Sequence, residues 1–180
     1  MSKEMDKSFI VEFSAGEVEF KKATQEVWDG FLEHLKSGNR SAGQLQLVNN
    51  CCVSLKVNEH TGIHELEKYL ENEPAAVSDI ADEIEIISGA DCEAVTVDRQ
   101  VKCSGFIFSA PSRSQWDTFQ ANLADRELVG GTASRMLLTE LVDDKEGFRS
   151  FIKESPAALA RIIMPVTRVA GRGIRIKQKK

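Results

Sequence analysis

The sequence predicts a mainly helical α+β protein made of two similar tandem units, residues 1–90 and residues 91–180, the second ending in a basic C-terminal tail. Three observations carry this prediction. Apolar residues recur with helical spacing after short stretches in which apolar and polar residues alternate, as they do in strands. A Trp-Asp pair and a Pro-Ala-Ala step each occur twice, in the same order. The 180 residues, 42% hydrophobic and 28% charged, have the composition of a globular protein.

The internal repeat consists of matched residues at two spacings. Pairs separated by 88 residues are Val18 and Phe106, Phe20 and Phe108, Trp28 and Trp116, Asp29 and Asp117, Phe31 and Phe119, and Leu35 and Leu123. Pairs separated by 82 residues are Leu66 and Phe148, Tyr69 and Phe151, Leu70 and Ile152, Pro74 and Pro156, Ala75 and Ala157, Ala76 and Ala158, Ile80 and Ile162, Ile84 and Val166, Ile87 and Val169, and Gly89 and Gly171. The spacing changes because Lys56 to Thr61 have no counterpart in the second unit. A repeat of this kind predicts two copies of one structure.

Each unit is expected to open with a β-hairpin, because apolar and polar residues alternate on both sides of a turn. In the first unit that turn is Ala15-Gly16. The alternating apolar residues are Phe9, Val11, Phe13, Val18 and Phe20 in the first unit and Val95, Val97, Val101, Cys103, Phe106 and Phe108 in the second.

Four helices are expected to follow the hairpin in each unit. Thr24 is the expected N-cap of the first, and Ser112 with Gln115 forms a capping box at its counterpart. Apolar residues with helical spacing are Trp28, Phe31 and Leu35 in the first helix; Leu47, Val48, Cys51 and Cys52, or Met136, Leu137 and Leu141, in the second; and Ile63, Leu66 and Leu70, or Phe148 and Ile152, in the third.

The fourth helix of each unit has boundary signals at both ends. Pro74 and Pro156 are expected in its first turn, where proline is favoured. Gly89 and Gly171 are expected to end it in the left-handed C-cap conformation. Pro165 lies inside the last helix and is expected to kink or restart it.

Charge is unevenly distributed along the chain. The net charge is −5, but no acidic residue follows Glu154, so the part before residue 161 has a net charge of −12. The basic residues of the C-terminal part are Arg161, Arg168, Arg172, Arg175, Lys177, Lys179 and Lys180. An acidic body argues against nucleic acid as a partner over most of the surface. We interpret the basic end as a solvated terminus, and a contact arm for an acidic partner or nucleic acid is the alternative.

The sequence contains no run of about 18 apolar residues that would span a membrane. Its first residues, MSKEMDKS, are polar and lead into no apolar stretch of the kind found in secretory signals. We therefore expect a cytoplasmic protein with reduced thiols. The cysteines are Cys51, Cys52, Cys92 and Cys103.

A zinc site is the first chemistry to consider. His60 and His64 are spaced i, i+4, and Cys51 and Cys52 precede them. However, the cysteines do not form a C-x-x-C pair, and Thr61-Gly62 is expected to begin a helix between the histidines. We interpret these residues as surface histidines beside core thiols, and we expect no metal and no cofactor.

Other candidate sites have simpler structural interpretations. His34 is a possible base for a cysteine nucleophile, but it lies on the first helix beside Glu33. The remaining candidates are acidic groups (Asp82, Glu83 and Glu85; Asp143 and Asp144), a glycine loop (Gly130-Gly131-Thr132) and an aromatic platform (Trp28 and Trp116). We interpret the acids as solvated, the glycines as an interhelical turn, and the tryptophans as core or rim residues. No catalytic residues are predicted, and we expect no enzyme activity.

The unit resembles the small tail-assembly chaperones of long-tailed phages and prophages. The resemblance is carried by an aromatic pair in residues 24–31, an apolar helix in residues 47–53, and a Pro-Ala-Ala step before a last apolar helix in residues 66–89. It covers residues 18–89 well and residues 106–171 less well. It implies a non-enzymatic helical adaptor in the bacterial host cytoplasm that binds the tape-measure protein or tail-tube subunits.

Two functions of different kinds are therefore compatible with the sequence. The first is the assembly factor that the resemblance implies. The second is a phage-encoded regulatory or inhibitory protein whose acidic surface covers a basic site on a host protein. The sequence does not identify the partner or the oligomeric state.

Overall fold

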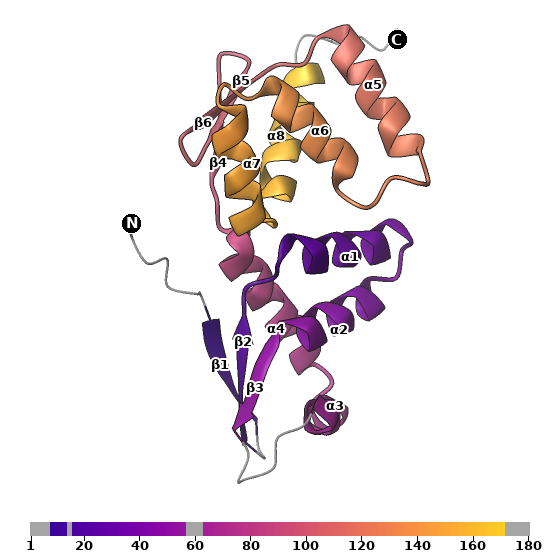
Figure 1. Ribbon diagram of the computed structural model, residues 1–180, viewed down its shortest axis with the longest axis vertical. Helices are drawn as coiled ribbons and strands as arrows, with labels where there is room; N and C mark the ends of the chain where they lie inside the picture. Colours follow the sequence, from indigo (N-terminus) through magenta and orange to yellow (C-terminus); the bar gives the residue numbers. More distant parts are fainter. Residues whose placement is uncertain (1–7, 14–15, 57–62, 172–180) are drawn as a thin grey trace, which may run out of the picture.

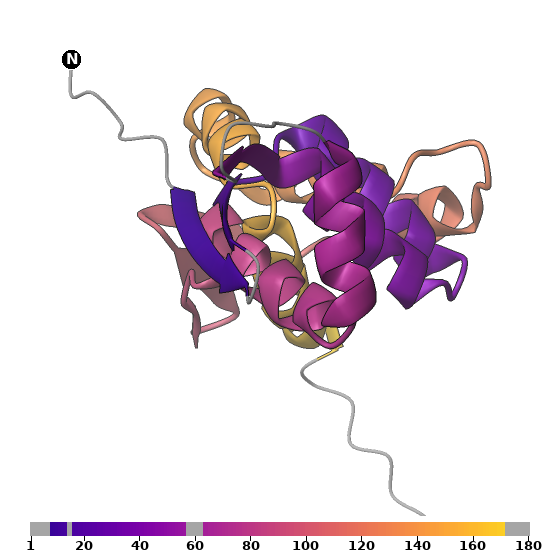
Figure 2. The same ribbon diagram turned by 90° about the horizontal axis from the view of Figure 1, so that it is seen from below.

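The computed structural model describes residues 8–13, 16–56 and 63–171. They form a mainly helical α+β structure in which each half of the chain has its own three-stranded antiparallel sheet (Figure 1). Seen from below, the helices of the first half overlie those of the second (Figure 2). The elements are β1 (Ser8–Phe13), β2 (Gly16–Lys21), α1 (Gln25–Lys36), α2 (Arg40–Cys51), β3 (Cys52–Lys56), α3 (Ile63–Asn72), α4 (Ala76–Glu85), the π-helical turn η1 (Ile86–Ala90), β4 (Ala94–Val97), β5 (Gln100–Cys103), β6 (Phe106–Ser109), α5 (Arg113–Ala124), α6 (Thr132–Leu141), α7 (Lys145–Glu154) and α8 (Ala158–Gly171).

The first sheet contains the expected hairpin and one strand more. β1 pairs with β2 so that Phe9 lies opposite Phe20. The extra strand, β3, pairs with the other edge of β2. The assignment of Cys52 to a helix is therefore wrong, because α2 ends at Cys51 and the backbone of Cys52 is already extended. Pairing Cys52 with Phe20 satisfies backbone groups at the sheet edge, which a longer helix would leave to water.

The second sheet is a three-stranded meander where a hairpin was expected, in the order β4-β5-β6. Asp98 and Arg99 both have positive φ in the β4–β5 turn, as do Ser104 and Gly105 in the β5–β6 turn. Two successive positive φ angles match the twist of flanking strands in a two-residue hairpin loop. The two turns explain how three short strands fit into this segment.

The helix signals near α1 and α5 are confirmed. Thr24 accepts a hydrogen bond from the backbone N–H of Val27 at 3.3 Å, and Ser112 and Gln115 form the capping box. In the predicted stripe of α1, Trp28 and Phe31 are buried, whereas Leu35 is exposed near the end of the helix.

The boundaries of the last helix of each half differ from the prediction. Pro74 and Pro156 both lie in turns, and the helices begin two residues later. Gly89 has a φ of +106°, as expected of a left-handed C-cap, whereas Gly171 is a helical residue without a left-handed φ. The helix also does not restart at Pro165. Ile162 before it and Val166 after it are buried in the core, which holds the helix in place across the missing backbone donor.

Two apolar clusters form the core, one in each half. The first includes Val18, Phe20, Trp28, Phe31, Leu47, Val48, Leu66, Ile80 and Ile84. The second includes Val101, Phe108, Phe119, Leu137, Leu138, Phe148, Ile152, Ile162 and Val166. Ala157, which lies in the second half, belongs to the first cluster. The two clusters therefore meet near the start of α8.

Hydrogen bonds around Ser88 join the two halves. The hydroxyl of the buried Ser88 accepts a hydrogen bond from the backbone N–H of Ala23 at 2.9 Å. The backbone carbonyl of Ser88 accepts a hydrogen bond from the backbone N–H of Ala157 at 3.1 Å. Lys22 and Glu154 form an ion pair at 2.8 Å beside it. One serine thereby connects the start of α1 to the start of α8.

Candidate functional site

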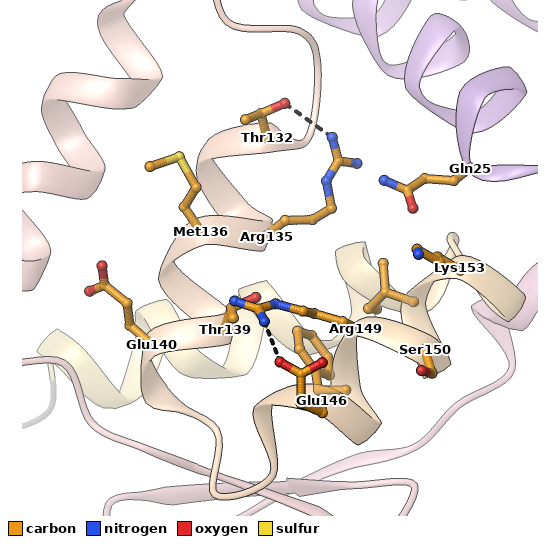
Figure 3. Close-up of a pocket in the computed structure, with 12 residues that line it drawn as sticks. Gln25, Thr132, Arg135, Met136, Thr139, Glu140, Glu146, Arg149, Ser150 and Lys153 are labelled. Carbon is orange, nitrogen blue, oxygen red and sulfur yellow. Dashed lines mark hydrogen bonds and ion pairs between the residues drawn. The ribbon is translucent and has the colours of Figure 1, made fainter.

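A cleft of about 530 Å³ lies between α6 and α7 and reaches the start of α1 (Figure 3). Most of its lining residues are polar or charged; Gln25 comes from the first half of the chain and the others come from the second. The side chains that give it this character are Gln25, Thr132, Arg135, Thr139, Glu140, Glu146, Arg149, Ser150 and Lys153.

Arg135 connects this cleft to α1. Its guanidinium forms an ion pair with Asp29 and donates a hydrogen bond to the hydroxyl of Thr132 at 3.0 Å. Both charged side chains are largely buried, with 20% of Arg135 and 14% of Asp29 exposed. Asp29 belongs to the repeated Trp-Asp pair, but the sequence contains no signal for its partner, which lies 106 residues away. The ion pair is therefore a fixed contact between the halves.

The other charges of the cleft lie on α7. Arg149 pairs with Glu146 one turn earlier on the same helix, and Lys153 lies one turn later. Among the side chains that the structure describes, no thiol or imidazole lines this cleft. Two of the cationic side chains of this cleft, Arg135 and Arg149, are held in ion pairs with Asp29 and Glu146. The cleft therefore offers polar and charged groups that suit the binding of a polar segment.

The cysteines of the first half do not form a nucleophilic site. Burial raises the pKa of the Cys51 thiol to about 12, although nearby Lys21 acts in the opposite direction. Burial also raises the pKa of Cys52. His34 lies against Gly43 near the start of α2, whereas Cys51 ends that helix, about 12 Å further along its axis. The interpretation of Cys51 as a core thiol is confirmed.

Cys92 and Cys103 lie close enough for each thiol to shift the pKa of the other, a proximity that the sequence does not indicate. Interaction with the Cys92 thiol lowers the pKa of Cys103 to about 7, while burial opposes this and the Ser104 hydroxyl assists it. The same interaction, together with burial, raises the pKa of Cys92. Their proximity depends on the turn between β4 and β5, which brings Cys103 opposite Ala94.

The metal hypothesis involves residues that the structure describes only in part. His60 lies outside the described residues, and His64 is known only as a backbone position in α3. Within residues 8–13, 16–56 and 63–171, no three histidine, cysteine or acidic side chains come together as metal ligands would.

The acidic candidates divide between a solvated surface and structural contacts. Asp82 and Glu83 are exposed on α4, and burial followed by the charge of Asp82 raises the pKa of half-buried Glu85. Asp143 accepts a hydrogen bond from the backbone N–H of Ile107 at 3.1 Å. Asp144 is the N-cap of α7. The last two residues therefore serve the fold and do not form a carboxylate dyad.

The glycine loop and the tryptophans also have structural places. Gly130 and Gly131 form the turn before α6, as expected. Trp28 is buried and packs on Phe31 with ring centroids 5.1 Å apart. Trp116 is half-buried and packs on Phe119 at 5.5 Å. The interpretation of the tryptophans as core and rim residues is confirmed.

No family model, no curated protein and no solved structure matches this chain. Among the helices that the structure describes, none combines the length and apolar character needed to cross a membrane.

Proposed function

We propose that this chain is a non-enzymatic binding protein for assembly, similar to tail-assembly chaperones, and that it acts through two copies of one helical unit. The units are residues 1–90 and residues 91–180, the second with the basic tail. The proposal implies a tape-measure or tail-tube protein as the partner and the bacterial host cytoplasm as the location. The observation that carries it is the matched order of elements in the two halves.

Both halves follow the same path through their elements. In the first, β1 and β2 lead to α1 and α2, and Cys52 then pairs with Phe20 before α3 and α4. In the second, β5 and β6 lead to α5 and α6, and Val142 then pairs with Phe108 before α7 and α8. Phe20 and Phe108 are matched residues of the repeat. In both halves the chain therefore returns to its sheet at the same matched residue. This agreement favours duplication over a chance similarity between helices.

Side-chain packing agrees with this order. The planes of Trp28 and Phe31 meet at 53°, and those of Trp116 and Phe119 meet at 52°. Matched residues that are buried in both halves include Phe20 and Phe108, Leu66 and Phe148, Leu70 and Ile152, Ile80 and Ile162, and Ile84 and Val166. Among the residues that the structure describes, β4 has no counterpart in the first half, and β3 is represented in the second only by the single bridge at Val142.

Two related surfaces in one chain suit a long partner with several binding segments. Linking two weak sites raises the overall affinity when both can be engaged together. The fixed contacts between the halves, through Ser88 and through the Arg135–Asp29 pair, hold these surfaces in one relative orientation. A tape-measure protein, as the resemblance implies, is a long helical partner of this kind.

Co-expression with the tape-measure protein encoded nearest to this chain tests the proposal. We expect the tape-measure protein to become more soluble and to co-purify with the chain. The Trp28→Ala and Trp116→Ala variants, compared for folding by circular dichroism, would show whether each half contributes to capture. A tape-measure protein that stays insoluble and is not captured would contradict the proposal.

Inhibition of a host protein is the second candidate. It is favoured by residues 63–85, which contain eight acidic residues and one basic residue, Lys68, for a net charge of −7 with His64 neutral. Capture of one host protein from a lysate with no tail protein, abolished by 0.5 M salt, would support this candidate in place of the first.

A further inference from the structure

A second groove, of about 360 Å³, lies between α2, α3 and the start of α4, at the lower end of the molecule in Figure 1. Its lining is mainly apolar. Leu70 forms part of the floor with 5% of its surface exposed, and Leu45 stands at the edge with 42% exposed. Pro74 and Val77 line the end nearest α4. A hydrogen bond from Gln44 to the Ser78 hydroxyl, next to Val77, ties α2 to α4 beside the groove.

Asn49 gives this groove one unsatisfied polar atom. Its side-chain oxygen is buried, yet within the part of the chain that the structure describes no group donates a hydrogen bond to it. A buried acceptor without a donor is costly, and native proteins have few of them. Because the half-buried Asn49 side chain lines the groove, its rotation toward an occupant that brings an N–H donor would satisfy this oxygen.

The charge at the rim selects the kind of occupant. Glu67 and Glu71 are exposed on α3 and lie one helical turn apart along the groove. They belong to residues 63–85, whose net charge is −7. The rim therefore attracts cationic side chains, and two lysines or arginines one turn apart on a second helix would match its spacing.

The cleft between α6 and α7 has the opposite charge at the equivalent places. The residues that follow Glu67, Leu70 and Glu71 by the repeat spacing of 82 are Arg149, Ile152 and Lys153, and all three line that cleft. The chain returns to its sheet at Cys52 in the first half and at Val142 in the second. Leu45 and Asn49 lie seven and three residues before Cys52, and Arg135 and Thr139 lie seven and three residues before Val142, so the two pairs occupy equivalent positions. The groove of the first half is thus apolar with two acidic residues at its rim, whereas the cleft of the second half is more polar and has basic residues at those two positions.

We propose that the groove between α2, α3 and α4 is the docking site for a basic amphipathic helix of the partner protein. The apolar face of that helix covers Leu45, Leu70 and Val77, and its cationic residues pair with Glu67 and Glu71. A donor from the helix reaches the Asn49 oxygen. The cleft of the second half has Arg149 and Lys153 in place of this acidic pair, so it offers the same segment no carboxylate at these two positions. This inference rests on the proposed protein-binding function and names the surface that performs it.

A designed peptide tests the groove without knowledge of the partner. The probe is an 18-residue fluorescein-labelled helix with leucines along one face and lysines on both flanks, and its counterpart has glutamates in place of the lysines. Fluorescence anisotropy with the full chain measures both. We expect the wild-type chain to bind the lysine peptide at least about tenfold more tightly than the glutamate peptide.

Matched variants separate the groove from general charge attraction. Glu71→Lys is expected to weaken binding of the lysine peptide about tenfold, whereas Glu127→Lys, with the same change in net charge, weakens it less than about twofold. Leu45→Ser is expected to weaken it about fivefold, and Leu123→Ser, at a similarly exposed leucine on α5, to leave it unchanged. Asn49→Leu should weaken binding yet raise the midpoint of urea unfolding, because it removes the unsatisfied oxygen.

Several outcomes would overturn the proposal. Equal losses for Glu71→Lys and Glu127→Lys mean that the peptide follows net charge and not the groove. A tenfold gain in affinity after removal of residues 172–180 means that the chain's own basic end occupies the site. Co-purification of the tape-measure protein at wild-type levels with Leu45→Ser and Glu71→Lys combined rejects this surface but leaves the chaperone function standing. Failure of the wild-type chain to capture any tail protein rejects the chaperone function alone.

Discussion

Replacing Gly89 with alanine tests how closely the two halves pack. Gly89 has a φ of +106°, and a Cβ added there would lie 2.7 Å from the Cβ of Ser155, at the end of α7. The left-handed backbone costs an alanine about 1–2 kcal/mol. The overlap lies beside the backbone of Ser155, so it is not relieved by a rotamer change, and it adds about 1–3 kcal/mol. Gly89→Ala should therefore reduce the free energy of unfolding by about 2–5 kcal/mol.

Gly105→Ala is the matched control for the backbone contribution. Its φ is +86°, and no atom lies within 4 Å of an added Cβ. It should lose only the cost of the left-handed backbone, about 1–2 kcal/mol. Adding Ser155→Gly to Gly89→Ala removes the atom that is struck, so the double variant should regain part of the loss despite the flexibility of the second glycine.

Urea unfolding followed by tryptophan fluorescence and by circular dichroism measures these differences, provided that the dependence of the unfolding free energy on urea concentration is the same for all variants. The decisive comparison is Gly89→Ala against Gly105→Ala. If both variants lose the same free energy of unfolding, or if adding Ser155→Gly restores none of it, then η1 does not pack against the end of α7 as described. The account of the contact between Gly89 and Ser155 is then refuted.

Two further predictions use the same protein. Cys51 should resist iodoacetamide at pH 8 until the protein is unfolded, because a thiol with a pKa of about 12 is almost wholly protonated at that pH. Fragment-ion mass spectrometry locates the label. Rapid labelling of Cys51 in the native protein would contradict its assignment as a core thiol. Arg135→Met should cost about 2–3 kcal/mol in urea unfolding, because it leaves the charge of Asp29 largely buried. Arg113→Met breaks the exposed pair with Asp117 and should change stability by less than about 0.5 kcal/mol; equal losses would show that the Arg135 pair is not buried in solution.

Local patterns in the sequence predict those parts of the fold that local forces determine. The alternation around Ala15-Gly16 predicts the β1–β2 hairpin, and Ser112 with Gln115 predicts the start of α5, because both signals lie within a few residues of the structure that they form. The strand at Cys52 is different. A short apolar run fits a helix end or a buried strand equally well, and only the free edge of β2 decides between them.

The functional surfaces could be predicted only in part for the same reason. The sequence indicates the apolar register of α2 and α3 but not that Leu45 and Leu70 line one groove, since their proximity depends on how two helices pack. It gives no sign of the Arg135–Asp29 pair or of the thiol pair Cys92 and Cys103. Such contacts join residues from different elements, and a single sequence carries no periodic signal for them.

The proposed duplication accounts for where the two halves keep similar residues and where they differ. Core positions such as Phe20 and Phe108 are constrained by packing, so two copies of one unit would keep similar side chains there. Surface positions such as Glu71 and Lys153 tolerate exchange of charge at little cost in stability. Charge can therefore reverse at such positions without unfolding either half. Because the contacts at Ser88 and the Arg135–Asp29 pair fix the halves relative to each other, the proposed partner would meet Glu67 and Glu71 on one half and Arg149 and Lys153 at the matched positions of the other. Under the proposed duplication, this difference would give two similar surfaces a fixed direction of binding.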